Sequence, residues 1–547
     1  MIANTELHSK MRSSRFRISR PRALPAGLER DVAFFIVLLA VIIVLQIASG
    51  AYRSEFSTYP DEPAHYVTSL MVREYLTSGH LLHPMAFAQN YYAHYPKVAF
   101  GHWPPVFYIV QAGWMLLFSA SRISVRLELA FTTAVLAFSL YWEAKRYFGA
   151  WAARLAALLL VCVPLIQTCT DQEMSEALLT LFCFWAAVFF ARYLQSERWK
   201  DNLWFGVFLS LAVLTKGNGW LLCLVPPIAM PLARKLHLLL RPVFWIAPAV
   251  VAVLCLPWQI MTMDLASEGW TNGTTPTVHY TADALHEFGL ILIGIVGPAL
   301  AALALIGIAA QVIEPLVRRK RVAPFPAVML ALIVATWIFH SLIPAGVEER
   351  KMVMAVPALL LFVIPGGFWL ADHLPLGAAL ARWRRALVAL AVGAVFAGVT
   401  FAIPRDHPYG YTQAARFITS RADFRGARIL TSSNSIGEGL LVSEVAMLQP
   451  RPQHTIVRAT KVLVHMNWNG SVYQPLVRSP QDVLSVLRRE RVSLVVTDTW
   501  PLSSELPHNA LLRKTIAEDP SRFQLLATCV PGGQAVAPQV RIYRFLP

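Results

Sequence analysis

Residues 102–122 read HWPPVFYIVQAGWMLLFSASR, and the way they meet a membrane decides the predicted topology. The segment is apolar, but it begins at a Pro-Pro pair, contains Gln111 and carries aromatic side chains such as Trp103 and Tyr108. Tryptophan and tyrosine collect at membrane–water interfaces. We therefore expect residues 104–120 to form an interfacial helix in the outer leaflet rather than a full crossing.

The rest of the chain has the composition of a membrane protein. Of its 547 residues, 56% are hydrophobic and 15% are charged, whereas an ordinary soluble protein is about a quarter charged. This composition excludes a soluble enzyme, a disordered chain or a fibrous repeat for the whole. A membrane-crossing helix needs about 20 mainly apolar residues. Besides 104–120, such segments lie at about 31–50, 125–143, 151–168, 175–194, 203–216, 219–233, 243–261, 287–310, 325–344, 352–371 and 386–403.

The basic loops give the direction of the spans, because lysine and arginine are retained on the cytoplasmic side. Seven basic residues between Lys10 and Arg30 precede the first span, and this region lacks the features of a cleaved signal peptide. The N-terminus is therefore predicted to be cytoplasmic. The other basic clusters fall on the same side only if residues 104–120 do not cross. They begin at Lys145, Arg198, Arg234, Arg318 and Arg382.

This parity argument predicts eleven crossings and an extracytoplasmic C-terminal region. We divide the chain into a basic cytoplasmic tail (1–30), a transmembrane domain (31–403, with a first outer loop at 51–124) and a soluble extracytoplasmic α/β domain (404–547). In the last domain, strands are expected at 427–431, 493–497 and 540–545, and a helix at 481–490. We interpret Gly437-x-Gly439 as a turn. The predicted fold class is a polytopic α-helical membrane protein with a C-terminal α/β domain.

The formal net charge of +16 does not indicate nucleic-acid binding, because most of the basic excess orients the spans and meets anionic membrane lipids. The six cysteines show no paired spacing, so neither a disulfide framework nor a zinc site is predicted.

Acidic residues are scarce in the membrane portion, and three sets of them lie on the predicted outer face. Such residues at span ends favour a shared polar cavity over three solvated loops. The sets are Asp61-Glu62, Asp171 and Glu173 with Glu176, and Glu348-Glu349.

This cavity would suit transfer chemistry. A carboxylate such as Asp61 or Glu62 can accept a proton from an attacking hydroxyl or amine, and the Asp171-x-Glu173 pair could bind Mg²⁺ or Mn²⁺. Basic side chains nearby could hold a phosphate; the candidates are Lys97, Arg126, Lys216, Arg350 and Lys351. Candidates for substrate contact are His102, Trp103, Tyr108, Glu176 and Trp258, although aromatic residues also collect at interfaces. Two short patterns, at 272–274 and 469–471, fit a glycosylation acceptor.

Six short motifs follow one another along the membrane portion. They are the Asp-Glu pair after the first span, the Pro-Pro-aromatic segment at 102–108, EALLT at 176–180, LTKG at 214–217, PW at 257–258, and a charged turn before MAVPAL at 354–359. This series resembles the integral-membrane glycosyltransferases of the GT-C class, in particular the protein O-mannosyltransferase and lipid A aminoarabinose transferase group. The resemblance covers about 30–370.

The resemblance implies transfer of a sugar, with inversion, from a polyprenyl-phosphate donor on the extracytoplasmic face of a plasma membrane, such as a bacterial inner membrane. The acceptor would be a lipid, a glycan or a protein. Asp61 matches the catalytic acidic residue of the family's first loop, which would act as a general base or position the acceptor. Asp171 and Glu173 resemble an acidic pair that binds metal in some members, and Glu176 competes for that role. Lys216 and the Arg350-Lys351 turn would neutralise the donor phosphate. Aminoarabinose transferases have a lysine where Trp103 stands here.

The residues also favour a lipid-linked donor independently, because the predicted cytoplasmic loops are too short to hold a nucleotide-binding domain. Two alternatives remain open. A transporter or lipid flippase would also have an outward-facing acidic cavity, although transporters often show repeated halves, and none is seen here. A non-catalytic membrane partner could use the outer domain to recruit other proteins.

Overall fold

The computed structural model describes residues 26–79, 82–99, 101–271, 277–374, 383–400, 409–466, 472–531 and 538–547. Several sequence-based predictions lie outside these residues. They are the basic tail before residue 26, the basic residue Arg382, the acceptor patterns at 272–274 and 469–471, and the domain boundary at 404.

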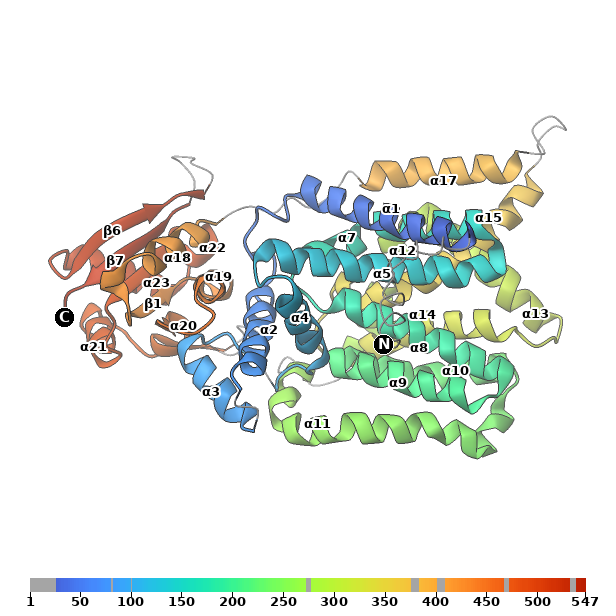
Figure 1. Cartoon of the computed structure of the whole chain (residues 1–547), viewed down its shortest axis with the longest axis horizontal. Coiled ribbons are helices and arrows are strands. Elements are labelled where there is room, and N and C mark those ends of the chain that lie inside the picture. The colour runs from blue at the N-terminus through green and yellow to red at the C-terminus, as the bar shows by residue number, and fades with distance from the viewer. Residues whose placement is uncertain are drawn as a thin grey trace, which may run out of the picture.

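Long helices lying side by side form the larger part of the molecule, and a small α/β part lies beyond one of their ends (Figure 1). Among the described residues, seven helices are long and apolar enough to cross a membrane. The chain is therefore a multi-span membrane protein. The helices at these spans are α1 (Ala26–Ser49), α5 (Arg122–Phe148), α8 (Glu176–Ser196), α11 (Ile246–Thr271), α12 (Val278–Ile308), α14 (Pro324–Leu342) and α15 (Val356–His373).

The predicted segment 151–168 is a pair of helices rather than one straight span. Helices α6 (Ala150–Cys162) and α7 (Pro164–Asp171) are bent by 59° at their junction. Pro164 causes the break, since it has no backbone N–H and pushes the preceding residue out of the helical conformation. This pair would make an eighth span.

Three shorter helices accompany these spans in the bundle (Figure 1). They are α9 (Trp199–Thr215), α10 (Val225–Leu232), which follows the 3-10 helix η1 (Gly217–Leu224), and α17 (Arg384–Thr400). They coincide with three of the predicted segments, so each predicted segment is helical. The count of eleven crossings stays a prediction.

Residues 104–120 contain only the short helix α4 (Val106–Leu117). Twelve helical residues span about 18 Å, too little for the hydrocarbon layer. This length agrees with the interfacial helix that the sequence predicts. Helix α4 packs against α2 (Glu62–Thr77), at the end of the bundle that faces the α/β part (Figure 1).

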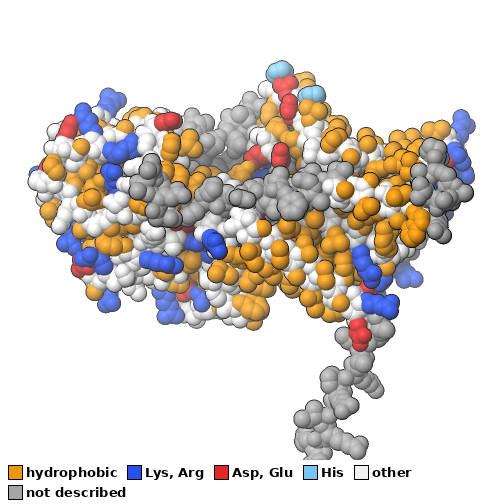
Figure 2. All heavy atoms as spheres, turned by 90° about the horizontal axis from the view of Figure 1, so that it is seen from above, with side chains coloured by type: hydrophobic (Ala, Val, Ile, Leu, Met, Phe, Trp, Pro, Cys, Tyr) orange, Lys and Arg blue, Asp and Glu red, His pale blue; other side chains and the backbone are white. Residues whose placement is uncertain are grey.

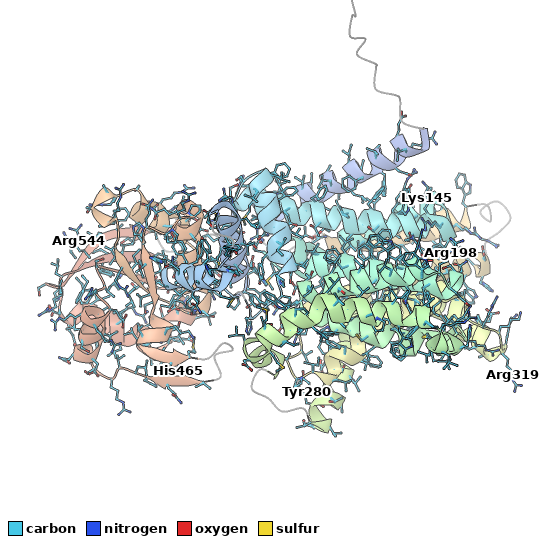
Figure 3. The ribbon with its side chains drawn as sticks, turned by 60° about the horizontal axis from the view of Figure 1, so that its bottom comes forward. Lys145, Arg198, Tyr280, Arg319, His465 and Arg544 are labelled. Atoms are coloured by element: carbon cyan, nitrogen blue, oxygen red, sulfur yellow. The ribbon has the colours of Figure 1, made fainter. Side chains whose placement is uncertain are left out.

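The basic loops gather at the opposite end. Figure 3 shows Lys145, Arg198 and Arg319 at the end of the bundle remote from Arg544 and His465 of the α/β part. Hydrophobic side chains cover much of the bundle between the two ends (Figure 2). This is the arrangement that the parity argument requires, while the assignment of that end to the cytoplasm remains a prediction.

The α/β part is built on a five-stranded sheet in the order β2-β1-β5-β7-β6. Strand β1 is parallel to β2 and β5, and β7 is antiparallel to β5 and β6. The strands of this sheet are β1 (Arg428–Ser432), β2 (Thr455–Arg458), β5 (Leu494–Asp498), β6 (Phe523–Cys529) and β7 (Val540–Phe545). The other elements include α18 (Tyr411–Thr419), α19 (Ser435–Leu448), α21 (Pro480–Arg489), α23 (Pro507–Glu518) and the hairpin of β3 (Val464–Met466) and β4 (Tyr473–Pro475).

The three predicted strands and the predicted helix are confirmed, but the turn predicted at Gly437-x-Gly439 is wrong. Both glycines lie in the first turns of α19. A side chain at Gly437 would collide with the Ser433 hydroxyl, and one at Gly439 would lie 2.7 Å from the Lys97 side chain. The glycines therefore serve close packing within the α/β part and against the first outer loop.

The first outer loop and the α/β part are joined by hydrogen bonds. From the region of α3 (Pro84–His94), the Tyr91 and Tyr95 hydroxyls donate to the carbonyls of Pro450 and Gln449, at 3.0 and 2.7 Å. The buried Glu55 carboxylate accepts the backbone N–H groups of residues 409 and 412. These contacts fix the α/β part on the end of the bundle.

Helices α12 and α15 approach closely at a pair of glycines, which gives a test of the packing. A Cβ at Gly307 would lie 1.9 Å from the carbonyl oxygen of Phe362. We expect Gly307→Ala to lower the free energy of unfolding by at least about 2 kcal/mol, because the helix backbones must separate. Thermal unfolding in detergent measures this. Gly294→Ala on the same helix has no atom within 4 Å of the added methyl, and an equal loss in this control would contradict the packing explanation.

Candidate functional site

A cavity of about 820 Å³ lies between the end of the helical bundle and the α/β part. Its walls come from the loop at 51–124, from the ends of several spans, and from the α/β part. Eight of the residues predicted from sequence line it, namely Asp61, Lys97, His102, Trp103, Glu176, Lys216, Arg350 and Lys351.

Arg350 connects the carboxylates of this cavity. Its guanidinium lies 3.4 Å from Asp61 Oδ2 and 3.7 Å from Glu176 Oε1, and its Nε donates to Glu348 at 2.5 Å. Lys216 Nζ donates to Glu176 at 2.6 Å. Because acidic and basic groups alternate, each can be charged without being left alone in a partly buried site.

Local backbone structure presents these side chains. Lys216 has an extended conformation at the end of α9, which stops the helix and begins the turn into η1. Arg350 lies in the short 3-10 helix η5 (Glu349–Ala355) that leads into α15, and it stacks on the Tyr59 ring at 4.6 Å.

Asp61 is the carboxylate best placed to act as a base. It precedes α2 at the N-cap position, but its side chain makes no capping hydrogen bond. The side chain is 17% exposed and lines the cavity. Its oxygens can therefore face a substrate, whereas a capping carboxylate would be occupied by backbone N–H groups.

Glu62 and Arg126 were predicted to act on substrates, but the structure places both behind the cavity. Both side chains are fully buried and form an ion pair at 3.3 Å. Glu62 also accepts three backbone N–H groups, from residues 58, 59 and 173, at 2.8–3.1 Å. A carboxylate with this many partners holds loops in place, so we reassign the pair from substrate contact to support of the site.

Asp171 and Glu173 do not fit a divalent ion. Both are buried, the Glu173 carboxylate accepts a hydrogen bond from the Gln111 amide, and burial raises the pKa of Glu173 to about 8. A carboxyl that keeps its proton at neutral pH is a poor metal ligand. Within the described residues, no group of three or more His, Cys, Asp and Glu side chains could hold a metal. We derive no step through Mg²⁺ or Mn²⁺, and metal dependence stays a prediction of the sequence.

Lys97 is buried where the first outer loop meets the α/β part. Its Nζ donates to the Pro60 carbonyl at 3.1 Å, one residue before Asp61. Burial and, to a lesser extent, the nearby charge of Arg458 lower the pKa of Lys97 to about 7, against the opposing effects of Asp61 and Glu438. The side chain is therefore close to losing its proton at neutral pH.

The aromatic candidates divide into two groups. Trp103 lines the main cavity and stacks on His65, whose ring centroid is 4.2 Å away. Tyr108 is buried, and its hydroxyl forms a hydrogen bond with His65 Nδ1 at 3.0 Å. Tyr108 therefore supports the stack of Trp103 on His65 rather than lining the cavity. Trp258 lines a second cavity of about 130 Å³, which shares His102, Trp103, Lys216 and Lys351 with the first.

Glu348, from the acidic set predicted at 348–349, also lines the cavity. The lining residues of the α/β part were not predicted from the sequence. Arg458, Thr460 and Lys461 of the α/β part also line the cavity. No signal in the sequence indicated them, because it does not show which face of that part meets the bundle.

Residues 102–261 match the family model described as dolichyl-phosphate-mannose-protein mannosyltransferase. No curated protein sequence matches the chain. ArnT from Cupriavidus metallidurans, solved bound to undecaprenyl phosphate, is similar in structure with a TM-score of 0.57 and 14% identity, over 93% of this chain and 98% of that one.

The archaeal oligosaccharyltransferase AglB from Archaeoglobus fulgidus, solved in complex with an inhibitory peptide and a dolichol-phosphate, is also similar. Its TM-score is 0.54 at 13% identity, over 86% of this chain and 70% of that one. These likenesses show the fold, and they confirm at that level the GT-C type of membrane protein that the sequence motifs resemble.

The buried pair of Glu62 and Arg126 gives a stability test. Arg126→Met leaves the Glu62 carboxylate without its cation in a fully buried position. We expect this change to lower the free energy of unfolding by about 3–5 kcal/mol, measured by thermal unfolding in detergent. Adding Glu62→Gln should recover part of the loss. Arg146→Met is the control, because Arg146 pairs with Glu143 at the bundle surface and is 48% exposed; equal losses in the two single variants would contradict the assignment.

The lowered pKa of Lys97 predicts that the free energy of unfolding depends on pH. Its pKa is 10.5 in the unfolded chain and about 7 in the folded protein. Between pH 7 and 10.5, the Lys97 side chain therefore carries a proton in the unfolded chain but not in the folded protein. Stability should therefore rise with pH from about 7 toward 10. Lys97→Met removes this contribution, so the difference between the unfolding midpoints of the wild type and Lys97→Met should change in favour of the wild type between pH 7 and 9. A difference that is constant with pH would show that Lys97 stays charged.

Proposed function

We propose that this protein is a glycosyltransferase that moves a sugar from a polyprenyl-phosphate donor to a hydroxyl or amine acceptor on the extracytoplasmic face, with inversion. The observation that carries the proposal is one cavity lined by the half-buried carboxylate of Asp61 and by the basic groups of Lys216, Arg350 and Lys351. A base beside phosphate-binding cations is what transfer from a sugar phosphate needs.

The comparisons support the kind of donor. Two of the similar structures were solved with a polyprenyl phosphate, undecaprenyl phosphate in ArnT and dolichol-phosphate in AglB. The matched family model also carries dolichyl-phosphate-mannose in its description. We extend the donor class, but not the sugar, to this chain.

In the proposed reaction, Asp61 accepts the proton of the acceptor hydroxyl or amine. The freed electron pair attacks the anomeric carbon from the face opposite the phosphate, a new bond from the acceptor to that carbon forms, and the bond from the carbon to the phosphate oxygen breaks. The electron pair of that bond leaves with the polyprenyl phosphate. Lys216, Arg350 and Lys351 stabilise the phosphate charge, and Glu176 holds Lys216 and Arg350 in position.

The second cavity supplies the place for the donor lipid next to its phosphate. It shares Lys216 and Lys351 with the main cavity, and Trp258 of α11 and Phe339 of α14 add apolar surface. Both helices belong to the membrane-crossing set. An isoprenoid that approaches through the bilayer would therefore meet apolar side chains first and the basic groups next.

The transport alternative receives less support from this geometry. Transporters place their ionisable groups near the middle of the membrane on interrupted helices. Here, the charged groups of the cavity lie at the end of the bundle, under the α/β part.

The base assignment predicts the effect of Asp61→Asn. This variant keeps the size of the side chain but cannot take up the proton, so the transfer rate should fall at least about a hundredfold. Purified protein is incubated with a panel of polyprenyl-phosphate sugars and candidate acceptors, and the release of free polyprenyl phosphate is followed by mass spectrometry.

Asp283→Asn is the matched control, because Asp283 is 63% exposed on α12. It should keep the wild-type rate. Near-normal turnover by Asp61→Asn would refute Asp61 as the base. Movement of an intact lipid-linked sugar across vesicle membranes, without release of lipid phosphate, would refute transfer as the function.

A further inference from the structure

The α/β part presents the carboxyl ends of its parallel strands to the cavity. Asn434 and Ser435, just after β1, line the cavity, and so do Arg458 at the end of β2 and Thr460 beyond it. Leu502, in the short helix after β5, lines it as well. All three parallel strands of the sheet therefore end at this one space.

Sheet topology makes this edge a preferred binding place. The connection after β1 leads to β2 on one side, whereas the connection after β5 leads away toward β6 and β7 on the other. Neighbouring strands whose connections diverge leave a crevice beyond their carboxyl ends, and open α/β sheets bind ligands there. In this protein, that crevice opens into the cavity that holds Asp61.

Charge specifies what the crevice would bind. Arg458 and Lys461 contribute cations to the wall formed by the α/β part. The carboxylate of Glu438, next to Arg458, is fully buried and is occupied by Arg458 at 2.8 Å and by the backbone N–H of Thr460 at 2.9 Å. Glu438 therefore directs Arg458 without presenting a negative charge to the cavity.

We propose that the strand ends of the α/β part bind the acceptor through an anionic group, a phosphate or a carboxylate, with Lys461 and Arg458 as the contacts. As a statement about the acceptor, this inference rests on the proposed function. It places the anion of the acceptor on the wall opposite the cations of Lys216, Arg350 and Lys351, which take the phosphate of the donor. The acceptor nucleophile would then lie between the two, next to Asp61.

Lys461→Gln tests the binding site directly, since Lys461 is exposed and its loss should not unfold the chain. The full-length protein is saturated with undecaprenyl phosphate, so that the donor-side cations are occupied. Thermal unfolding is then followed as inorganic phosphate is added, with sodium chloride at equal ionic strength as the blank. In Lys461→Gln, we expect the phosphate concentration that gives half-saturation to be at least about fivefold higher than in the wild type, because one charge-assisted hydrogen bond is lost.

Lys514→Gln is the matched control, because Lys514 is 63% exposed on α23 and does not line the cavity. It should bind phosphate as the wild type does. The inference is overturned if Lys461→Gln binds phosphate like the wild type, or if Lys514→Gln weakens binding equally.

A transfer assay separates the acceptor role from the binding site. Two matched acceptors are compared, an alkyl glucoside and the same glucoside carrying a 6-phosphate. The wild type should prefer the phosphorylated acceptor, and Lys461→Gln should raise the KM for it about fivefold while kcat changes less than twofold. Equal KM values for both acceptors in the wild type would overturn the acceptor role. If neither acceptor reacts in the wild type while phosphate binding depends on Lys461, the proposed function fails and the anion site stands.

Discussion

The buried ion pair of Glu62 and Arg126 is the interaction on which the geometry of the cavity depends. Breaking a fully buried ion pair costs several kcal/mol, so the two side chains hold α2 and α5 in one relative position. Glu62 also binds the backbone of the loop before α2 and of the turn before α8. One carboxylate thereby fixes two segments that are far apart in sequence. Asp61 precedes Glu62 directly, and Glu176 follows that turn, so the pair sets the positions of both carboxylates in the cavity.

The contacts of Arg350 show how the cavity can hold a cation in place for a phosphate while no phosphate is bound. Three carboxylates surround the guanidinium at 2.5–3.7 Å, so its charge is compensated in the free protein. A donor phosphate can take the place of one carboxylate, and the guanidinium is never left without a partner. The displaced carboxylate would be the more exposed one, Asp61 or Glu348, because Glu176 is held by Lys216 as well. Release of Asp61 from Arg350 would leave its oxygens available to a proton, which couples donor binding to the base.

The sequence predicted the fold well because long apolar runs and basic loops are strong signals. Within the residues that the structure describes, every predicted span contains a helix, and the three predicted strands lie in the sheet. The cavity residues at span ends, such as Asp61, Lys216 and Arg350, could be found because topology puts them at one end of the bundle. The sequence could not predict which of these side chains face the cavity and which are buried behind it. Asp61 and Glu62 are neighbours in sequence, yet successive residues at a helix start point in different directions, and only one faces the cavity. The strands β2 and β6 were missed because four or seven residues without strict alternation give little signal.

Whether the α/β part is a fixed wall or a mobile lid follows from its contacts with the first outer loop. Gly439 has no side chain, so the backbone of α19 can lie directly on Lys97 and bury its charge-bearing chain. Moving the α/β part away would expose Lys97 and break the hydrogen bonds that Tyr91 and Tyr95 donate to it. It would also leave the buried Glu55 carboxylate without the backbone N–H groups that it accepts. Because each of these losses costs free energy without an evident replacement, the α/β part acts as a fixed wall. In the proposed reaction, the substrates would then reach Asp61 from the side, between that wall and the membrane, where the lipid of the donor could lie next to the basic groups of the cavity.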